Sequence, residues 1–220
     1  SNFLGIENIK KIEGYDVSHF SGDNAVASCV VFSNQGPKKK NYRLFNIPAE
    51  LSGNDIGSLE HVMERRLKYY ADPEIKPDVI LIDGGKNQLN FVNSIINKSV
   101  HHDIKVISIV KGSKRMRATE TIISEAGIIE LDKYSKAFLI LQEIRDESHR
   151  FAIRAQRNKK RKKINKSVLD NINGIGSVLK IRLIKKFKNI QKIKDASIEQ
   201  LMTVKGINEK MAKIIQNELR

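Results

Sequence analysis

Asp83 is a residue whose type and position suggest chemistry. It ends the run Asp78-Val-Ile-Leu-Ile-Asp83, whose four inner residues are all apolar, and two glycines follow it. Open α/β sheets bind ligands at the carboxyl ends of their strands, so an acid at this place suits a site. The alternative is that Asp83 caps the helix that follows the glycines. Taken alone, the residue fits either role.

A second acid, Asp16, lies inside the first strand that the sequence predicts, although aspartate has a poor β propensity. If this strand neighbours the strand that ends at Asp83, the two carboxylates converge. Paired carboxylates repel each other, and a divalent cation is the usual remedy. Oxygen ligands without clustered Cys or His favour Mg²⁺ or Mn²⁺ over zinc. Asp55 begins a predicted helix, where it either caps that helix or supplies a third carboxylate.

The first third of the chain must place Asp16. Three β-rich segments are separated by short turns, which predicts an antiparallel meander. These segments are residues 9–19, 25–33 and 41–47. A helix with one apolar face is predicted over residues 58–70.

The next segments must place Asp83. A buried strand over residues 77–83, a Gly-Gly turn, an amphipathic helix and a second buried strand over 105–110 predict a parallel β-α-β unit. A hairpin around Glu125-Ala-Gly127 and a long helix from about Ser135 follow. The combination predicts an α/β fold with a mixed sheet.

The positive charge lies in the last third of the chain. Residues 1–149 contain 20 Lys and Arg and 20 Asp and Glu, whereas residues 150–220 contain 20 and 5. A general compositional bias would spread over both parts, so this asymmetry favours binding to a polyanion. The basic run includes Arg157, Lys159, Lys160 and Arg161.

Two Gly-Ile turns stand in the basic part, about 32 residues apart, each between predicted helices. Glycine lets backbone N–H groups approach a phosphate, and the helix that follows favours an anion. Two such segments should pack into one small all-α domain that binds the backbone of duplex DNA. The turns comprise Gly174, Ile175 and Gly176 in the first copy, and Lys205, Gly206, Ile207 and Asn208 in the second.

Other features limit the class of protein. No apolar run approaches the roughly 20 residues of a membrane helix, so we expect no membrane association. Cys29 has no partner within the chain, which favours a reducing cytoplasm. His149 lies beside the apolar stripe of the long helix, where a lone histidine is more often a packing or hydrogen-bonding residue than a catalyst.

Four motifs together resemble the C-terminal half of the UvrC family, the nuclease subunit of bacterial nucleotide-excision repair. They are IEGYDVSHFSG, LIDGGKNQL, LQEIRDESHRFAI and the pair SVLDNINGIG and ASIEQLMTVKGI. The resemblance implies an RNase H-like endonuclease domain followed by a tandem helix-hairpin-helix domain. It also implies an incision on the 5′ side of a lesion in double-stranded DNA. UvrB is the implied direct partner and UvrA an indirect one, with no small-molecule cofactor.

The resemblance assigns roles to single residues. The catalytic aspartates correspond to Asp16 and Asp83, and the catalytic histidine to His149. Asp55 corresponds to one member of an acidic pair whose other member is Asn54 here. The second hairpin has Asn208 where the family has glycine, and asparagine tolerates a left-handed backbone.

The expected organisation is an endonuclease domain over residues 1–158, a basic linker over 159–166 and a DNA-binding domain over 167–220. Two alternatives remain at this point. One is a DNA-binding protein that keeps the first domain only as a scaffold, and the other is a different RNase H-like nuclease. The first predicts salt-sensitive binding without metal-dependent cutting, and substrate choice would separate the second.

Overall fold

The computed structural model describes residues 4, 6, 8–18, 25–110 and 120–219, with the side chains of 160–167 left aside. The chain divides into two compact units, Ser1–Gln156 and Arg157–Arg220. Helix α3, Lys136–Asp170, passes from one unit into the other and includes the segment expected as a basic linker. None of the helices in the described residues is long and apolar enough to cross a membrane.

The first unit begins with the antiparallel meander that the sequence predicts. Strand β1 pairs with β2 over its whole length, and β2 pairs with both β3 and β4. Two short 3-10 helices lie in the connections, at Lys39–Asn41 and Ala49–Leu51. The strands are β1 Lys11–Ser18, β2 Val26–Ser33, β3 Gly36–Pro37 and β4 Arg43–Asn46.

The second half of this unit is the predicted parallel β-α-β arrangement. Strand β5, Val79–Asp83, pairs in parallel with β1 on one side and with β6, Lys105–Val110, on the other. The hairpin of β7, Thr121–Ser124, and β8, Gly127–Ile129, extends the sheet beyond β6. The strand order is β3-β2-β1-β5-β6-β7-β8, and this mixed sheet confirms the expected fold class.

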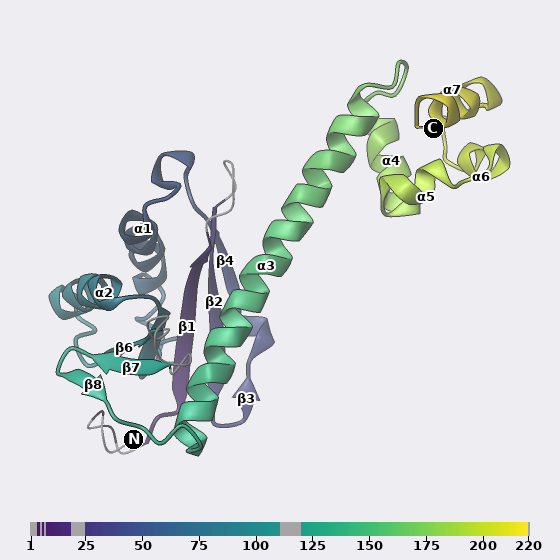
Figure 1. Cartoon of the computed structure of the whole chain (residues 1–220). Helices are drawn as coiled ribbons and strands as arrows, with labels where there is room; N and C mark the ends of the chain where they lie inside the picture. Colours follow the sequence, from purple (N-terminus) through teal and green to yellow (C-terminus); the bar gives the residue numbers. More distant parts are fainter. Residues whose placement is uncertain (1–3, 5, 7, 19–24, 111–119, 220) are drawn as a thin grey trace, which may run out of the picture. The chain divides into compact units, whose positions relative to one another are not determined.

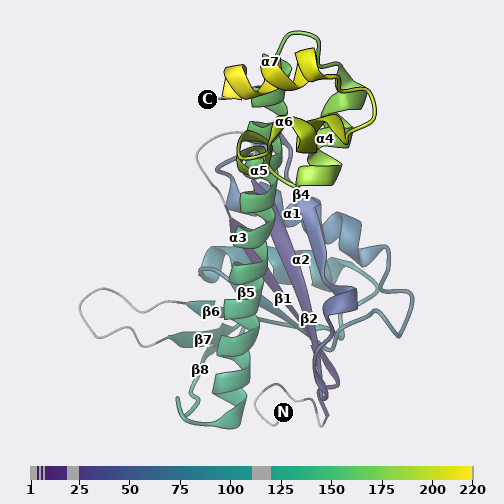
Figure 2. The same ribbon diagram turned by 90° about the vertical axis from the view of Figure 1, so that its right-hand side faces the viewer.

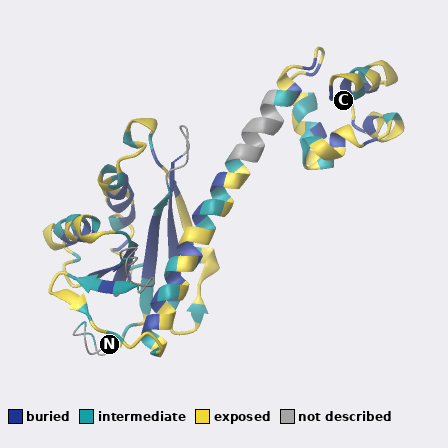
Figure 3. Cartoon of the chain, in the orientation of Figure 1, coloured by how far each residue is buried: buried dark blue, intermediate teal, exposed yellow. Residues whose placement is uncertain are grey.

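Helices cover both faces of the sheet (Figures 1 and 2). On one face lie α1, Asp55–Leu67, and α2, Lys86–Lys98, which also pack against each other. The other face carries the first part of α3. Gly14 on β1 allows this close approach, because a Cβ at that position would overlap Ile144 of α3. The inner strands are therefore buried on both sides (Figure 3).

The second unit is a separate helical bundle around its own apolar core. Its helices after α3 are α4 Ser177–Phe187, α5 Ile190–Lys194, α6 Ile198–Met202 and α7 Glu209–Leu219. One Gly-Ile turn joins the end of α3 to α4, and the other joins α6 to α7. Leu183, Ile193, Leu201 and Ile215 are fully buried between the helices, so each hairpin depends on the other for its core.

Candidate metal centre and nucleic-acid interface

The carboxylates of Asp16 and Asp83 come from neighbouring strands. The parallel ladder of β1 and β5 is in register up to the pair Tyr15 and Ile82, and each aspartate follows directly. The condition under which the two carboxylates are expected to converge is met. Both acids therefore lie at the carboxyl edge of the sheet, the edge at which open α/β folds bind ligands.

Helix α3 brings His149 to the same edge. The helix is fixed on β2 by a hydrogen bond of 2.8 Å from the Ser28 hydroxyl to the carbonyl of Ser148, and Ser28 pairs with Asp16 in the sheet. Nδ1 of His149 lies 3.5 Å from Oδ2 of Asp16. One ligand atom each from Asp16, Asp83 and His149 lies within 4.8 Å of the others, so this group could hold one metal ion.

The three side chains differ in their exposure. Asp16 is 7% exposed and accepts a hydrogen bond of 2.6 Å from the Ser18 hydroxyl. Asp83 is half-buried, and the His149 side chain is 52% exposed. The cluster thus has a buried side that orients Asp16 and an open side that a phosphate group can reach. Two carboxylates and an imidazole suit a divalent cation such as Mn²⁺, and the oxygens also suit Mg²⁺.

The helix-cap roles that the sequence left open fall to other residues. The N-cap of α2 is Gly85, whose N–H donates to Gln88 over 3.0 Å, while Asp83 is the last residue of β5. The N-cap of α1 is Asn54, whose side chain accepts from the N–H of Gly57 over 2.9 Å. Neither Asp83 nor Asp55 is therefore a helix cap.

Asp55 lines the same open cleft as Asp83, outside the three-residue group. The first turn of α1 forms one wall of this cleft and the Gly-Gly turn with the start of α2 forms the other. Oδ2 of Asp55 accepts a hydrogen bond of 2.7 Å from Nε2 of Gln88. Gln88 thus links both walls, a role that the sequence analysis did not assign. Its only sequence signal is its place at the third position of the helix after a glycine.

The two Gly-Ile turns pack reciprocally in the second unit. Gly174 and Gly206 have φ angles of 86° and 99°, in the left-handed region that favours glycine. A Cβ on Gly174 would meet Met211 of α7, and a Cβ on Gly206 would meet Leu179 of α4. Each turn therefore rests on the second helix of the other hairpin, which fixes the two turns relative to each other.

The last residue of each turn, Gly176 or Asn208, is the N-cap of the helix that follows. The side chain of Asn208 accepts from the N–H of Met211 over 2.9 Å, as a helix N-cap does, and φ is not positive there. The left-handed role expected for Asn208 is therefore wrong, because the left-handed residue is Gly206. Gly176 is the matching N-cap of α4, with a φ of −76°.

Ile175 and Ile207, predicted as DNA-binding residues, serve the core of the second unit. Their side chains are 5% and 6% exposed. Their N–H groups donate to the carbonyls of Ile172 and Val204 within the turns. Contacts with a ligand would therefore fall to their neighbours, including the backbone N–H groups at the starts of α4 and α7.

The cations of the basic run lie on α3. Arg157 is exposed, and Lys159 is half-buried, which lowers the pKa of its ammonium group. The side chains of Lys160 and Arg161 lie outside the described residues. Of the two cations in this run whose side chains are described, Arg157 is therefore the more open to a phosphate.

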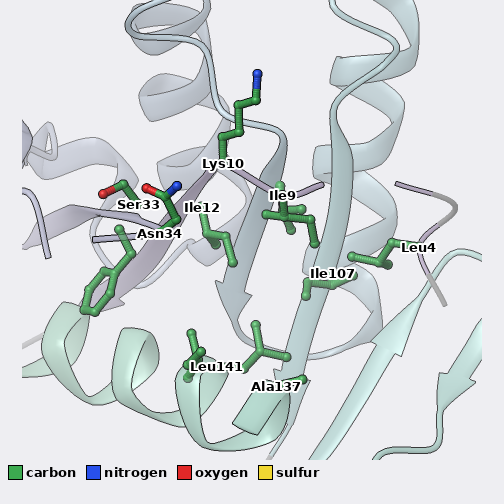
Figure 4. A pocket seen from close by; sticks show the side chains of 12 residues that line it. Leu4, Ile9, Lys10, Ile12, Ser33, Asn34, Ile107, Ala137 and Leu141 are labelled. Carbon is green, nitrogen blue, oxygen red and sulfur yellow. The ribbon is translucent and has the colours of Figure 1, made fainter. Parts of the chain in front are cut away.

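A different cavity lies toward the opposite end of the first unit, under the beginning of α3 (Figure 4). Ile9, Ile12, Ile107 and Leu141 point into it. Among the described residues, its lining includes no acid, histidine or cysteine, so these residues offer no groups for hydrolytic or metal chemistry. The cleft beside Asp83 is the better candidate site.

Known families match both units. Residues 1–153 match the UvrC RNAse H endonuclease domain, and residues 166–220 match the SAM-like helix-hairpin-helix tandem. The first unit is therefore of the nuclease type, and the second is a tandem helix-hairpin-helix domain. Human ENDOV has a TM-score of 0.35 to this structure at 19% identity, over 48% of this chain and 47% of its own.

Curated relatives match nearly the whole chain. UvrABC system protein C of Pseudoalteromonas translucida is 39% identical over 98% of this chain and 36% of its own length. The protein of the same name from Legionella pneumophila (strain Paris) is 38% identical over 95% of this chain and 34% of its own length. The chain belongs to the UvrC family. It spans about a third of the length of these relatives.

Proposed function

We propose that this chain carries the part of a nucleotide-excision repair nuclease that cuts DNA on the 5′ side of a lesion. The reaction is divalent-metal-dependent hydrolysis of a phosphodiester bond. The observation that carries the proposal is the convergence of Asp16, Asp83 and His149 on one point at the carboxyl edge of the sheet. Membership of the UvrC family supports the same reaction.

Asp16 and Asp83 are the proposed ligands for Mg²⁺ or Mn²⁺. A divalent cation held there would polarise a phosphoryl oxygen and lower the pKa of an attacking water. The donor set fits such an ion, because two carboxylates that repel each other lie beside an imidazole within 4.8 Å. Ser18 donates to Asp16 and keeps this carboxylate in one orientation.

His149 either completes the ligand set or moves a proton. Its imidazole is half exposed and lies within 3.5 Å of Asp16, so one side of the ring faces the acid and another faces solvent. A neutral imidazole that is open to solvent can remove a proton from water, and a protonated one can deliver a proton to the leaving oxygen. Asp55 is proposed as a supporting acid on the opposite wall of the cleft, where Gln88 holds it.

The second unit is proposed to hold the backbone of damaged double-stranded DNA. Gly174, Gly176, Gly206 and Asn208 place helix N-termini and backbone N–H groups on one surface, which suits phosphates. Lys205 and Arg157 add exposed positive charge. UvrB is the proposed direct partner, with UvrA acting before it, and the cytoplasm is the proposed compartment.

The test is a nicking assay on a lesion-bearing duplex loaded with UvrB, in Mg²⁺ or Mn²⁺. Asp83→Ala should lower the rate of incision at least about 10³-fold, since it removes a metal ligand, while DNA affinity stays within about twofold. Asp146→Ala is the matched control, because Asp146 is an exposed acid on α3 that belongs to no ligand group. Equal rates for Asp83→Ala and the unmodified chain would overturn the assignment.

A further inference from the structure

The first unit carries a second hollow with the chemistry of a nucleic-acid contact. It lies between β4 and the end of α1, and we call it the β4–α1 surface. None of the described residues that line it is acidic. The lining residues are Arg43, Leu44, Phe45, Arg65, Arg66, Lys68, Tyr69 and Ile75. This concentration of cations is notable because residues 1–149 are balanced in charge.

Three of the four cations have no carboxylate partner in the described part of the chain. Arg66 is neutralised, because its guanidinium pairs with the buried Glu13. Arg43, Arg65 and Lys68 are exposed and form no ion pair there. Exposed Lys38, Lys39 and Lys40 precede β4 and extend the positive charge. A surface of uncompensated cations attracts a polyanion.

The β4–α1 surface also has positioned guanidinium groups and an exposed aromatic ring. The side chain of Arg43 is fixed by hydrogen bonds of 3.0 and 2.8 Å to the carbonyls of Lys40 and Tyr42. The Arg65 guanidinium lies 5.9 Å from the centre of the buried Phe45 ring. Tyr69 is 59% exposed at the rim. Positioned guanidinium groups suit phosphates, and an exposed aromatic ring suits a base or a sugar.

Helix α1 connects this surface to the candidate metal centre. The first residue of the helix, Asp55, lines the cleft beside Asp83, and Lys68 follows its last residue. A helix of 13 residues is about 20 Å long at 1.5 Å per residue. At 3.4 Å per base pair, this length corresponds to about six nucleotides. Both sites belong to one compact unit, so their separation is fixed.

We propose that the β4–α1 surface binds the phosphate backbone of the same DNA about six nucleotides from the cut. Arg43, Arg65 and Lys68 contact the phosphates, and Tyr69 packs on a sugar or base. This inference rests on the proposed function, because a DNA strand in the cleft brings the polyanion to this surface. An acidic protein is the other class of partner that the charge would attract. DNA is favoured because the proposed reaction itself brings DNA to the same compact unit.

The test measures DNA affinity in EDTA with the whole chain carrying Asp83→Ala, so that cutting plays no part. The variant R43A/R65A/K68A is compared with K98A/K105A/K136A, which removes three exposed cations elsewhere on the unit. The first variant should bind about 10- to 100-fold more weakly at moderate salt. Its slope of log affinity against log salt should fall by about 2 to 3, while the control stays near the parent.

Two further arms make the test specific. R43K/R65K/K68R keeps the charges and should retain most of the affinity, which separates loss of charge from loss of fold. Shortening the duplex from one end should abolish the difference between R43A/R65A/K68A and its parent once fewer than about six base pairs remain on that side of the cut.

Three results would overturn the proposal. The first is that R43A/R65A/K68A binds DNA within twofold of its control and with the same salt slope. This result would contradict DNA binding even if the variant failed to bind an acidic protein. The second is that the charge-retaining variant loses as much affinity as the alanine variant. The third is that the difference in DNA affinity between R43A/R65A/K68A and its parent stays the same when the duplex is shortened from either end. In each case the incision assay with Asp83→Ala still decides the proposed function separately.

Discussion

Strand β1 carries a carboxylate on each of its faces, and the surroundings of the two carboxylates are opposite in character. Glu13 points toward α1 and is fully buried. It accepts hydrogen bonds from Tyr15 and Tyr70, each of 2.6 Å, and pairs with Arg66. Asp16 points toward α3, where it meets one hydroxyl, one imidazole and a second carboxylate nearby.

The difference separates a structural acid from a functional one. The donors around Glu13 come from the protein itself, and burial raises the pKa of the Tyr15 and Tyr70 hydroxyls, which keeps both as donors. At Asp16 and Asp83 the protein instead gathers negative charge at an open edge, an arrangement that a cation stabilises. A buried acid with several donors holds a fold together, whereas acids that are clustered at a strand end indicate a site.

Removal of Glu13 is expected to have the largest effect on stability. Glu13→Ala should lower the free energy of unfolding of the first unit by about 3–5 kcal/mol, because Arg66 remains buried without its partner. The double change E13M/R66M should recover most of this loss, since apolar side chains of similar volume replace the pair. Urea unfolding followed by circular dichroism measures both. If Glu13→Ala lowered the free energy of unfolding by less than about 1 kcal/mol, Glu13 would not be the structural acid that the comparison with Asp16 requires.

Removal of the Ser18 hydroxyl should have an intermediate effect, on binding and not on folding. Ser18→Ala removes the hydrogen bond that orients Asp16, so Mn²⁺ affinity should fall about 10- to 100-fold. The free energy of unfolding without metal should change by less than about 1.5 kcal/mol. Isothermal titration calorimetry measures the affinity, with Ser94→Ala as control. An unchanged affinity would mean that Ser18 does not support the site.

The smallest effect is expected at an exposed ion pair, Lys76 and Asp103. A hydrogen bond of 2.6 Å from Lys76 lowers the pKa of the Asp103 carboxyl. The pair therefore stabilises the fold above the unfolded pKa of about 3.9, and this contribution is lost as pH falls through the lower folded pKa.

Because Asp103 is mostly exposed, Lys76→Ala should cost only about 0.2–1 kcal/mol at pH 7. Urea unfolding of both chains should show this gap narrowing as the pH is lowered from 5 toward 3. A gap that stays constant over this range would show that Lys76 acts through packing instead of charge.

Local patterns in the sequence predict most of the fold and much of the site. The apolar run before Asp83 and the alternation around Asp16 identify two strands. The β-α-β order pairs β5 with β6, whereas at the sequence level the pairing of β1 with β5 is only a condition and comes from the structure. The family motif adds His149, which neither spacing nor composition could bring to the acids. The hydrogen bond that fixes this part of α3 on β2 joins Ser28 to Ser148, which lies 120 residues later in the sequence.

The features that the sequence missed depend on distant partners or on the geometry of a turn. Glu13 is separated from Arg66 by 53 residues and from Tyr70 by 57, and no local pattern links them. The role of Asn208 depends on which residue of its turn has a positive φ, and that residue is Gly206. From the residue types alone, either Gly206 or Asn208 could have the positive φ, so the sequence did not show that Asn208 is the N-cap of α7.

Asp16 and Asp83 are proposed to hold a divalent cation beside His149, and metal-dependent stabilisation tests this central claim most directly. Thermal unfolding is measured with and without Mn²⁺ for the unmodified chain, Asp83→Asn and the control Asp146→Asn. At 100 times its dissociation constant, Mn²⁺ should stabilise the unmodified chain and the control by about 2.7 kcal/mol. Asp83→Asn should show little or no stabilisation at the same concentration. An equal response of Asp83→Asn and the unmodified chain would contradict the account.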